Sequence, residues 1–159
     1  MDVTDDEKNK GKTVEVGRAN FDTQTKNYTV FDAPGHKNYV PNMIMGAALA
    51  DFAGLVISAR KGEFEAGFEK EGQTREHAQL AKSLGVQKLV VIVNKMDDCK
   101  WDKARWDEIQ TGLTPFLTAT GYNVDRDVYW VPISGLTGAN ILEPAGSTCK
   151  WYEGPTLVQ

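Results

Sequence analysis

The residues Asp-Ala-Pro-Gly-His at 32–36 form the first cluster that could carry out chemistry, at the end of an apolar segment. Asp32 offers a carboxylate for a divalent cation, and Gly35 would let a phosphate approach a backbone N–H closely. His36 can orient a water molecule for attack on phosphorus. An Asx turn followed by an exposed histidine explains the same residues, and Asp-x-x-Gly alone favours that simpler interpretation.

A second cluster, Asn-Lys-Met-Asp at 94–97, has the donors and acceptors needed to read a purine base. The Asp97 carboxylate can accept both N–H donors of a guanine Watson–Crick edge, a pair that adenine does not present. Asn94 can bond to the base and join neighbouring loops, and the aliphatic stem of Lys95 can lie over a purine ring. Met96 is expected to point away and pack. The alternative is that Asp97 or Asp98 caps the helix that follows.

Two further clusters are weak on their own. Ser-Gly-Leu at 134–136 could present the Gly135 N–H to a purine carbonyl oxygen, or could be an ordinary flexible loop. Thr13, in Gly-Lys-Thr at 11–13, offers a hydroxyl for magnesium and an N–H for a terminal phosphate, or is a solvated threonine at the start of a strand. The four clusters together are far rarer by chance than any one of them.

The elements that must position these clusters follow from the hydrophobic pattern. Short apolar segments alternate with helical ones, which predicts an α/β fold with a mostly parallel sheet after an opening antiparallel hairpin. Ligands bind such sheets beyond the carboxyl ends of the strands, where three of the clusters lie. We expect strands at 13–22, 28–33, 52–59, 88–98 and 128–133, helices at 40–50, 75–84 and 101–120, a loop at 60–72 and a short final helix from 147.

The bulk properties exclude several classes of protein. The chain has 159 residues and a formal net charge of −4, which suits one soluble domain and argues against a dedicated, sequence-specific nucleic-acid-binding module. No apolar run is long enough to span a bilayer, so no membrane partner is expected. Cys99 and Cys149 lack metal-ligand spacing and are interpreted as free thiols, which favours a cytoplasmic protein.

The four clusters, in this order, resemble the switch I, switch II, guanine-specificity and final-loop motifs of translational GTPases. The resemblance runs from Gly11 to the C-terminus, and residues 62–86 are similar to the elongation-factor-one-alpha group. Within that group, residues 12–21, 56–70 and 134–141 most resemble the GTP-binding subunits of eukaryotic translation termination, the class II release factors.

The resemblance implies a P-loop NTPase-like G domain, with helices on both faces of the sheet, that hydrolyses GTP with Mg²⁺. It implies the ribosome and a class I release factor as partners, with ribosome rescue, aminoacyl-tRNA delivery or a non-hydrolysing regulatory fragment as alternatives. His36 would be the catalytic residue, and Thr13 and Asp32 would hold magnesium. The residues implied to bind GTP are Thr13, Asp32, Ala33, Pro34, Gly35, His36, Asn94, Lys95, Met96, Asp97, Ser134, Gly135 and Leu136.

One motif of this family is absent from the sequence, the phosphate-binding Gly-x-x-x-x-Gly-Lys-Ser/Thr loop. We therefore interpret residues 1–12 as part of switch I and 13–159 as an incomplete G domain that lacks its first strand. The strands at 28–33 and 52–59 would then lack the neighbour expected between them. We expect these 159 residues alone to fold poorly, to bind GTP weakly and to be inactive as a GTPase.

Overall fold

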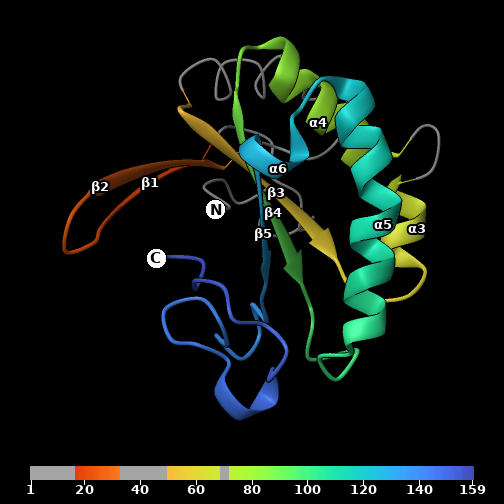
Figure 1. Ribbon diagram of the computed structural model, residues 1–159. Helices are drawn as coiled ribbons and strands as arrows, with labels where there is room; N and C mark the ends of the chain where they lie inside the picture. Colours follow the sequence, from red (N-terminus) through yellow and green to blue (C-terminus); the bar gives the residue numbers. More distant parts are fainter. Residues whose placement is uncertain (1–16, 33–49, 69–71) are drawn as a thin grey trace, which may run out of the picture.

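The computed structural model describes residues 17–32, 50–68 and 72–159, which form a hairpin, a small parallel sheet and a layer of helices (Figure 1). Most predicted strands and both long predicted helices within these ranges are present, with ends shifted by a few residues. In chain order the elements are β1 (Gly17–Asp22), β2 (Asn27–Asp32), β3 (Phe52–Ser58), α3 (Glu63–Phe68), α4 (Gln73–Ser83), β4 (Lys88–Asn94), α5 (Lys103–Thr120), α6 (Val124–Asp127), β5 (Val128–Pro132) and a 3-10 turn (Gly146–Thr148).

The strands β3, β4 and β5 form a parallel sheet in that order. Ser58 lies opposite Asn94, and Val93 lies opposite Pro132, so the three strands reach the same edge of the sheet at their carboxyl ends. The strands are rich in valine, isoleucine and leucine, whose branched side chains pack well on a pleated surface. The sheet therefore brings the segments that follow Asn94 and Pro132 together, as the sequence predicted.

The helix α5 covers one face of this sheet. Asp102 caps its first turn by accepting a hydrogen bond from the Ala104 N–H at 3.1 Å, and Gly121, at a φ of 98°, ends it in the left-handed conformation. Neither Asp97 nor Asp98 is the cap. The buried side chains of α5 recur at helical spacing and form one stripe toward the sheet: Trp106, Ile109, Leu113, Phe116 and Leu117.

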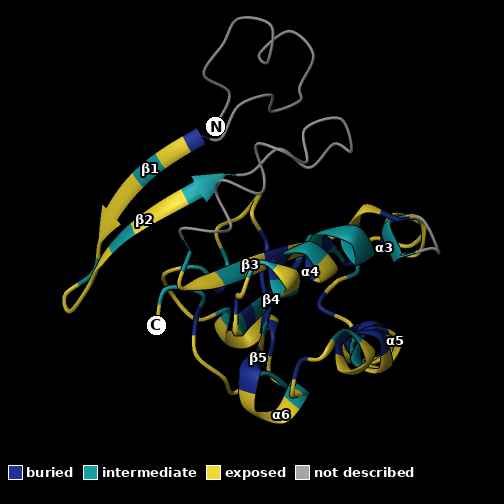
Figure 2. Ribbon diagram, turned by 90° about the horizontal axis from the view of Figure 1, so that it is seen from above, coloured by how far each residue is buried: buried dark blue, intermediate teal, exposed yellow. Residues whose placement is uncertain are grey.

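The opposite face of the sheet is partly bare in the part of the chain that the structure describes. Val56 is 60% exposed and Tyr129 is 54% exposed, while Leu55 and Ile57 point into the core. The strand β3 is therefore buried on only one face of the sheet. Figure 2 shows α3, α4 and α5 together on one side of the sheet. The helix expected at 40–50 lies outside the described residues except for its last position.

The strands β1 and β2 form a separate antiparallel hairpin, in which Gly17 lies opposite Asp32. Its turn is closed by Thr23, whose N–H and hydroxyl both donate to the Lys26 carbonyl. An edge-on contact between the rings of Tyr28 and Phe52, at a centroid distance of 6.4 Å, links the hairpin to the start of β3. The strands β2 and β3 thus belong to different sheets, in line with the expectation that they are not direct neighbours.

Three local predictions were wrong. Residues 60–72, expected to be a loop, contain the helix α3, whose Phe64 is buried beneath it. The helix predicted at 75–84 begins earlier, at Gln73, with Gly72 at its N-cap. The segment from 147 forms only a 3-10 turn and no final helix. None of the helices in the described ranges is long and apolar enough to span a membrane.

Candidate functional site

Asn94, the last residue of β4, joins three segments at the carboxyl edge of the sheet. Its side-chain oxygen accepts hydrogen bonds from the N–H of Lys95 at 2.7 Å and from the N–H of Gly135 at 2.8 Å. Its backbone carbonyl accepts from the N–H of Ala59, just after β3, at 2.8 Å. The loop-joining role predicted for Asn94 is therefore present in the fold.

The residues after Asn94 turn sharply so that only some of them face outward. Lys95 has a φ of 63°, in the left-handed region, and the next residue, Met96, is fully buried in the core. The Met96 N–H donates to the Ile133 carbonyl at 3.1 Å, which ties this loop to the end of β5. Met96 packs inward as the sequence predicted.

Asp97 has an unusual side-chain environment. Its Oδ1 atom is buried and has no hydrogen-bond partner among the described residues. A buried carboxylate oxygen without a donor is costly, and such atoms in native proteins normally have a partner. The carboxylate at this position can accept N–H donors from a ligand that binds at the carboxyl edge of the sheet.

The segment after β5 supplies the second wall. Ser134 is fully buried, and its Oγ accepts from the Thr137 N–H at 3.1 Å, so its hydroxyl shapes the loop. A Cβ atom on Gly135 would lie 3.2 Å from the Asn94 Oδ1, which shows how closely the two loops approach. Leu136 is 88% exposed and thus free to cover a flat ligand.

Charged side chains surround Lys95 in a network that sequence reasoning missed. The Lys95 Nζ donates to Glu63 at 2.6 Å, and Arg60 pairs with both Glu63, at 2.9 Å, and Asp98. The hydrogen bond from Lys95 is the main reason that the pKa of Glu63 is lowered to about 2. No local signal could have found this network, because Glu63 and Lys95 are 32 positions apart in the sequence.

The other predicted residues fall elsewhere. Asp32 ends β2 and is half-buried, in the sheet that does not contain Asn94 or Asp97. In the described part of the chain, no group of three or more His, Cys, Asp or Glu side chains could hold a metal ion. Thr13 and residues 33–36, which complete the predicted phosphate and magnesium site, lie outside the described residues. The structure therefore brings together the predicted base-reading residues: Asn94, Lys95, Met96, Asp97, Ser134, Gly135 and Leu136.

Comparison with known proteins identifies the family of this chain. The family model described as the elongation factor Tu GTP binding domain matches residues 1–152. The chain belongs to this family. This GTP binding domain is 57% identical over 162 residues to the eukaryotic peptide chain release factor GTP-binding subunit of Kluyveromyces lactis, with 100% of the chain covered. It is also 57% identical over 161 residues to the protein of that name in Dictyostelium discoideum, with 99% covered.

Solved structures of the same family have the same fold. Sup35 complexed with GDP matches with a TM-score of 0.75 and 44% identity, covering 88% of this chain and 33% of that one. The GTPase-like domain of Saccharomyces cerevisiae Ski7 bound to GTP matches with a TM-score of 0.78 and 26% identity, covering 98% of this chain and 36% of that one. The family predicted from the four motifs is thus confirmed. The chain spans 23% and 29% of the length of the two curated relatives.

Proposed function

We propose that this chain is the guanine-nucleotide-binding part of a GTPase that acts in translation termination. The observation that carries the proposal is the buried Asp97 Oδ1, which has no donor in the described part of the chain. Guanine presents two adjacent N–H donors, on N1 and on the exocyclic amine, and a carboxylate can accept both. The likeness to release factor GTP-binding subunits supports the same assignment.

The surrounding residues suit the rest of the base. The Gly135 N–H donates to the Asn94 side-chain oxygen at 2.8 Å, and it would exchange this partner for the guanine carbonyl oxygen when the base is bound. Lys95 and Leu136 come from the two loops and can lie over opposite faces of the ring. The neighbouring carboxylate of Glu63 holds the Lys95 ammonium at 2.6 Å, which restrains the lysine stem.

The phosphate half of the site is assigned to residues of the N-terminal third. Thr13 and Asp32 would hold Mg²⁺, since hydroxyl and carboxylate oxygens are the hard ligands that this ion prefers. When bound, the ion neutralises charge on the phosphates. Gly35 would donate its backbone N–H to the γ-phosphate, and His36 would orient the attacking water, so the chain contributes mainly positioning. Ala33 and Pro34, between Asp32 and Gly35 in the sequence, would complete this half.

The cellular role follows from the named relatives, and it concerns the whole protein. We infer that the protein works in the cytoplasm, on the ribosome, with a class I release factor, and that hydrolysis of GTP couples stop-codon recognition to peptide release. Ribosome rescue and aminoacyl-tRNA delivery are less well supported, because the curated relatives at 52–57% identity are release factor subunits. We propose that residues 1–12 belong to switch I and that residues 13–159 belong to the G domain, and we expect these 159 residues alone to be inactive.

Two measurements on the full-length protein test the proposal. Equilibrium competition against a fluorescent GDP should give strong preference for GDP and GTP over ADP and ATP. Phosphate release from GTP should rise when ribosomes and the class I factor are both present, and His36→Ala should abolish the rise while leaving GDP affinity unchanged. Equal affinity for adenine and guanine nucleotides would refute base selection. Stimulation by aminoacyl-tRNA, and not by the class I factor, would instead favour the elongation role.

A further inference from the structure

The turn that follows Asp97 is held in an unfavourable backbone conformation. Lys100 and Trp101 have φ values of 54° and 55°, so two consecutive non-glycine residues are left-handed. Such a conformation is strained, and it persists only where its surroundings hold it. Inside the turn, the Lys100 N–H donates to the Asp97 carbonyl at 3.0 Å, and the Trp101 N–H donates to the Met96 carbonyl at 2.8 Å. The conformation of this turn therefore fixes the position of Asp97.

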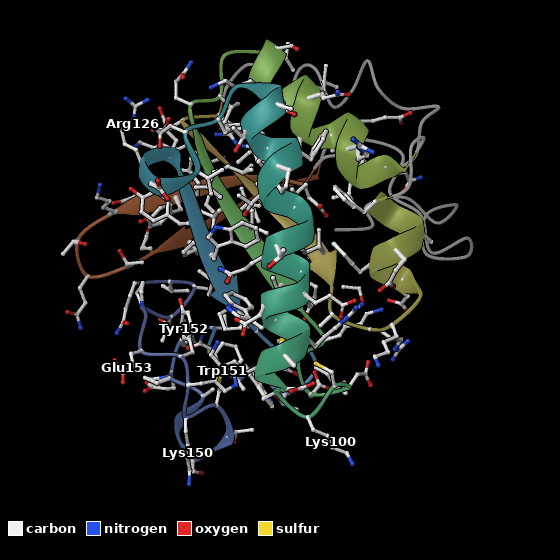
Figure 3. All side chains as sticks on the ribbon, turned by 45° about the vertical axis from the view of Figure 1, so that its right-hand side comes forward. Lys100, Arg126, Lys150, Trp151, Tyr152 and Glu153 are labelled. Carbon is white, nitrogen blue, oxygen red and sulfur yellow. The ribbon has the colours of Figure 1, made fainter. Side chains whose placement is uncertain are left out.

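A residue 50 positions later supports the turn from outside. The indole N–H of Trp151 donates to the Trp101 carbonyl at 2.7 Å. The Trp151 ring is itself anchored, because it packs against Trp106 of α5 at a centroid distance of 5.4 Å. Trp106 is buried in the core. Figure 3 shows Trp151 and Tyr152 beside the start of α5, close to the turn that carries Lys100.

Packing holds both ends of the turn, because the side chains of Met96 and Trp101 are buried in the core. A hollow of about 500 Å³ separates it from the loop after β5 and from the 3-10 turn, and is lined by Asp97, Lys100, Trp101, Thr137, Ala139 and Thr148. Beside this packing, hydrogen bonds tie the Asp97 segment to distant parts of the chain: the Gly135 N–H donates to Asn94 and the Met96 N–H donates to Ile133 at its start, and the Trp151 N–H donates to Trp101 at its end.

We propose that Trp151 is a positioning residue for guanine selection, because its indole N–H holds the Trp101 carbonyl and thereby the left-handed turn that orients the Asp97 carboxylate. The proposal rests on the proposed function. A positioning role for Trp151 differs from a purely structural role in its effect on the preference between nucleotides. A misplaced Asp97 weakens its hydrogen bonds to both guanine N–H donors, and the bond to the 2-amino group has no counterpart in a base that lacks this amine, whereas general destabilisation weakens the binding of all nucleotides equally.

The test compares GDP with inosine diphosphate, whose hypoxanthine base lacks only the 2-amino group. In the full-length protein, Trp151→Phe removes the N–H donor and keeps an aromatic ring against Trp106. We expect the ratio of GDP to inosine diphosphate affinity to fall by roughly three- to ten-fold, the equivalent of one ordinary hydrogen bond. Trp151→Leu is a second donor-free variant that serves if the phenylalanine variant does not fold, as judged by its melting curve.

The matched control is Tyr152→Phe. The Tyr152 hydroxyl donates to Trp130 and Pro155 carbonyls in the same aromatic cluster, but not to the turn after Asp97. Its removal should leave the affinity ratio unchanged. A normal ratio in both Trp151 variants, with the wild type discriminating between the two nucleotides, would overturn the positioning role. A wild type that binds the two nucleotides equally would overturn the proposed base-reading function, and this inference with it.

Discussion

Replacing Asp97 by asparagine changes one acceptor oxygen into a donor nitrogen at the point where the base is expected to be read. The Asp97 Oδ1 atom is buried and accepts no hydrogen bond from the described residues. No other hydrogen bond within this part of the protein therefore offsets the loss of this acceptor. With guanine bound, the new amide N–H₂ group would face the 2-amino group, donor against donor. With xanthine bound, it would donate to the carbonyl oxygen that replaces that amine.

The expected magnitude follows from the single charge-assisted hydrogen bond that is lost. Such a bond contributes about 1.5–3 kcal/mol, so Asp97→Asn should weaken GDP binding by roughly ten- to a hundred-fold. Binding of xanthosine diphosphate should improve by a similar factor, because repulsion between the carboxylate and the base carbonyl is replaced by a hydrogen bond. The assay is equilibrium competition of each diphosphate against a fluorescent nucleotide on the full-length protein.

The neighbouring carboxylate provides the control. Asp98→Asn makes the same chemical change one residue later, where the side chain is exposed and pairs with Arg60. It should leave the preference between the two nucleotides unaltered. If Asp97→Asn keeps its affinity for GDP and gains none for xanthosine diphosphate, Asp97 does not read the base. A reversal of preference in the Asp98 variant would mean that the wrong carboxylate has been assigned.

Three further predictions concern the support of the site. Asn94→Ala removes the acceptor for two N–H groups, including that of Gly135. It should lower the melting temperature, and it should weaken the affinity for GDP by roughly ten-fold. Arg105→Leu should cost about 1–3 kcal/mol in urea unfolding, because it leaves the buried carbonyl of Ala59 without its donor while the carboxylate partners return to water. A hydrogen bond from Arg105 is the main reason that the pKa of Glu65 is lowered to about 2. The contribution of Glu65 to folding stability is therefore present above pH 4.5 and lost as the pH falls toward 2. Glu65→Gln should flatten the plot of unfolding free energy against pH over this range.

The positions of Asn94 and Ser134 could be predicted because they depend on a simple rule. Asn94 ends one parallel strand and Ser134 comes soon after the next, and parallel strands carry their carboxyl ends to one edge. Met96 was predicted to pack inward, and it is fully buried. Such local patterns need no knowledge of distant contacts.

What could not be predicted depends on contacts between distant segments. The bond between Trp151 and Trp101 joins positions 50 residues apart, and the four tryptophans are scattered in the sequence although three of them meet in one cluster. The helix α3 was missed because Gly62 and Gly67 are typical of a loop, whereas burial of Phe64 against the core favours the helix. Tertiary packing outweighed the local preference there.

The restraints on the base-reading loop come from β3, β4, β5, α5 and the segment that ends the chain. None of the hydrogen bonds described for Asn94, Met96 or Trp101 involves the hairpin that carries Asp32. In the proposed site, the half that reads the base is thus positioned by hydrogen bonds that do not involve this hairpin. Because GDP and GTP share the same base, this half should contribute equally to the binding of both. We therefore expect any preference between GDP and GTP in this chain to originate in the segment from Thr13 to His36. We expect the same segment to produce any change of shape on hydrolysis.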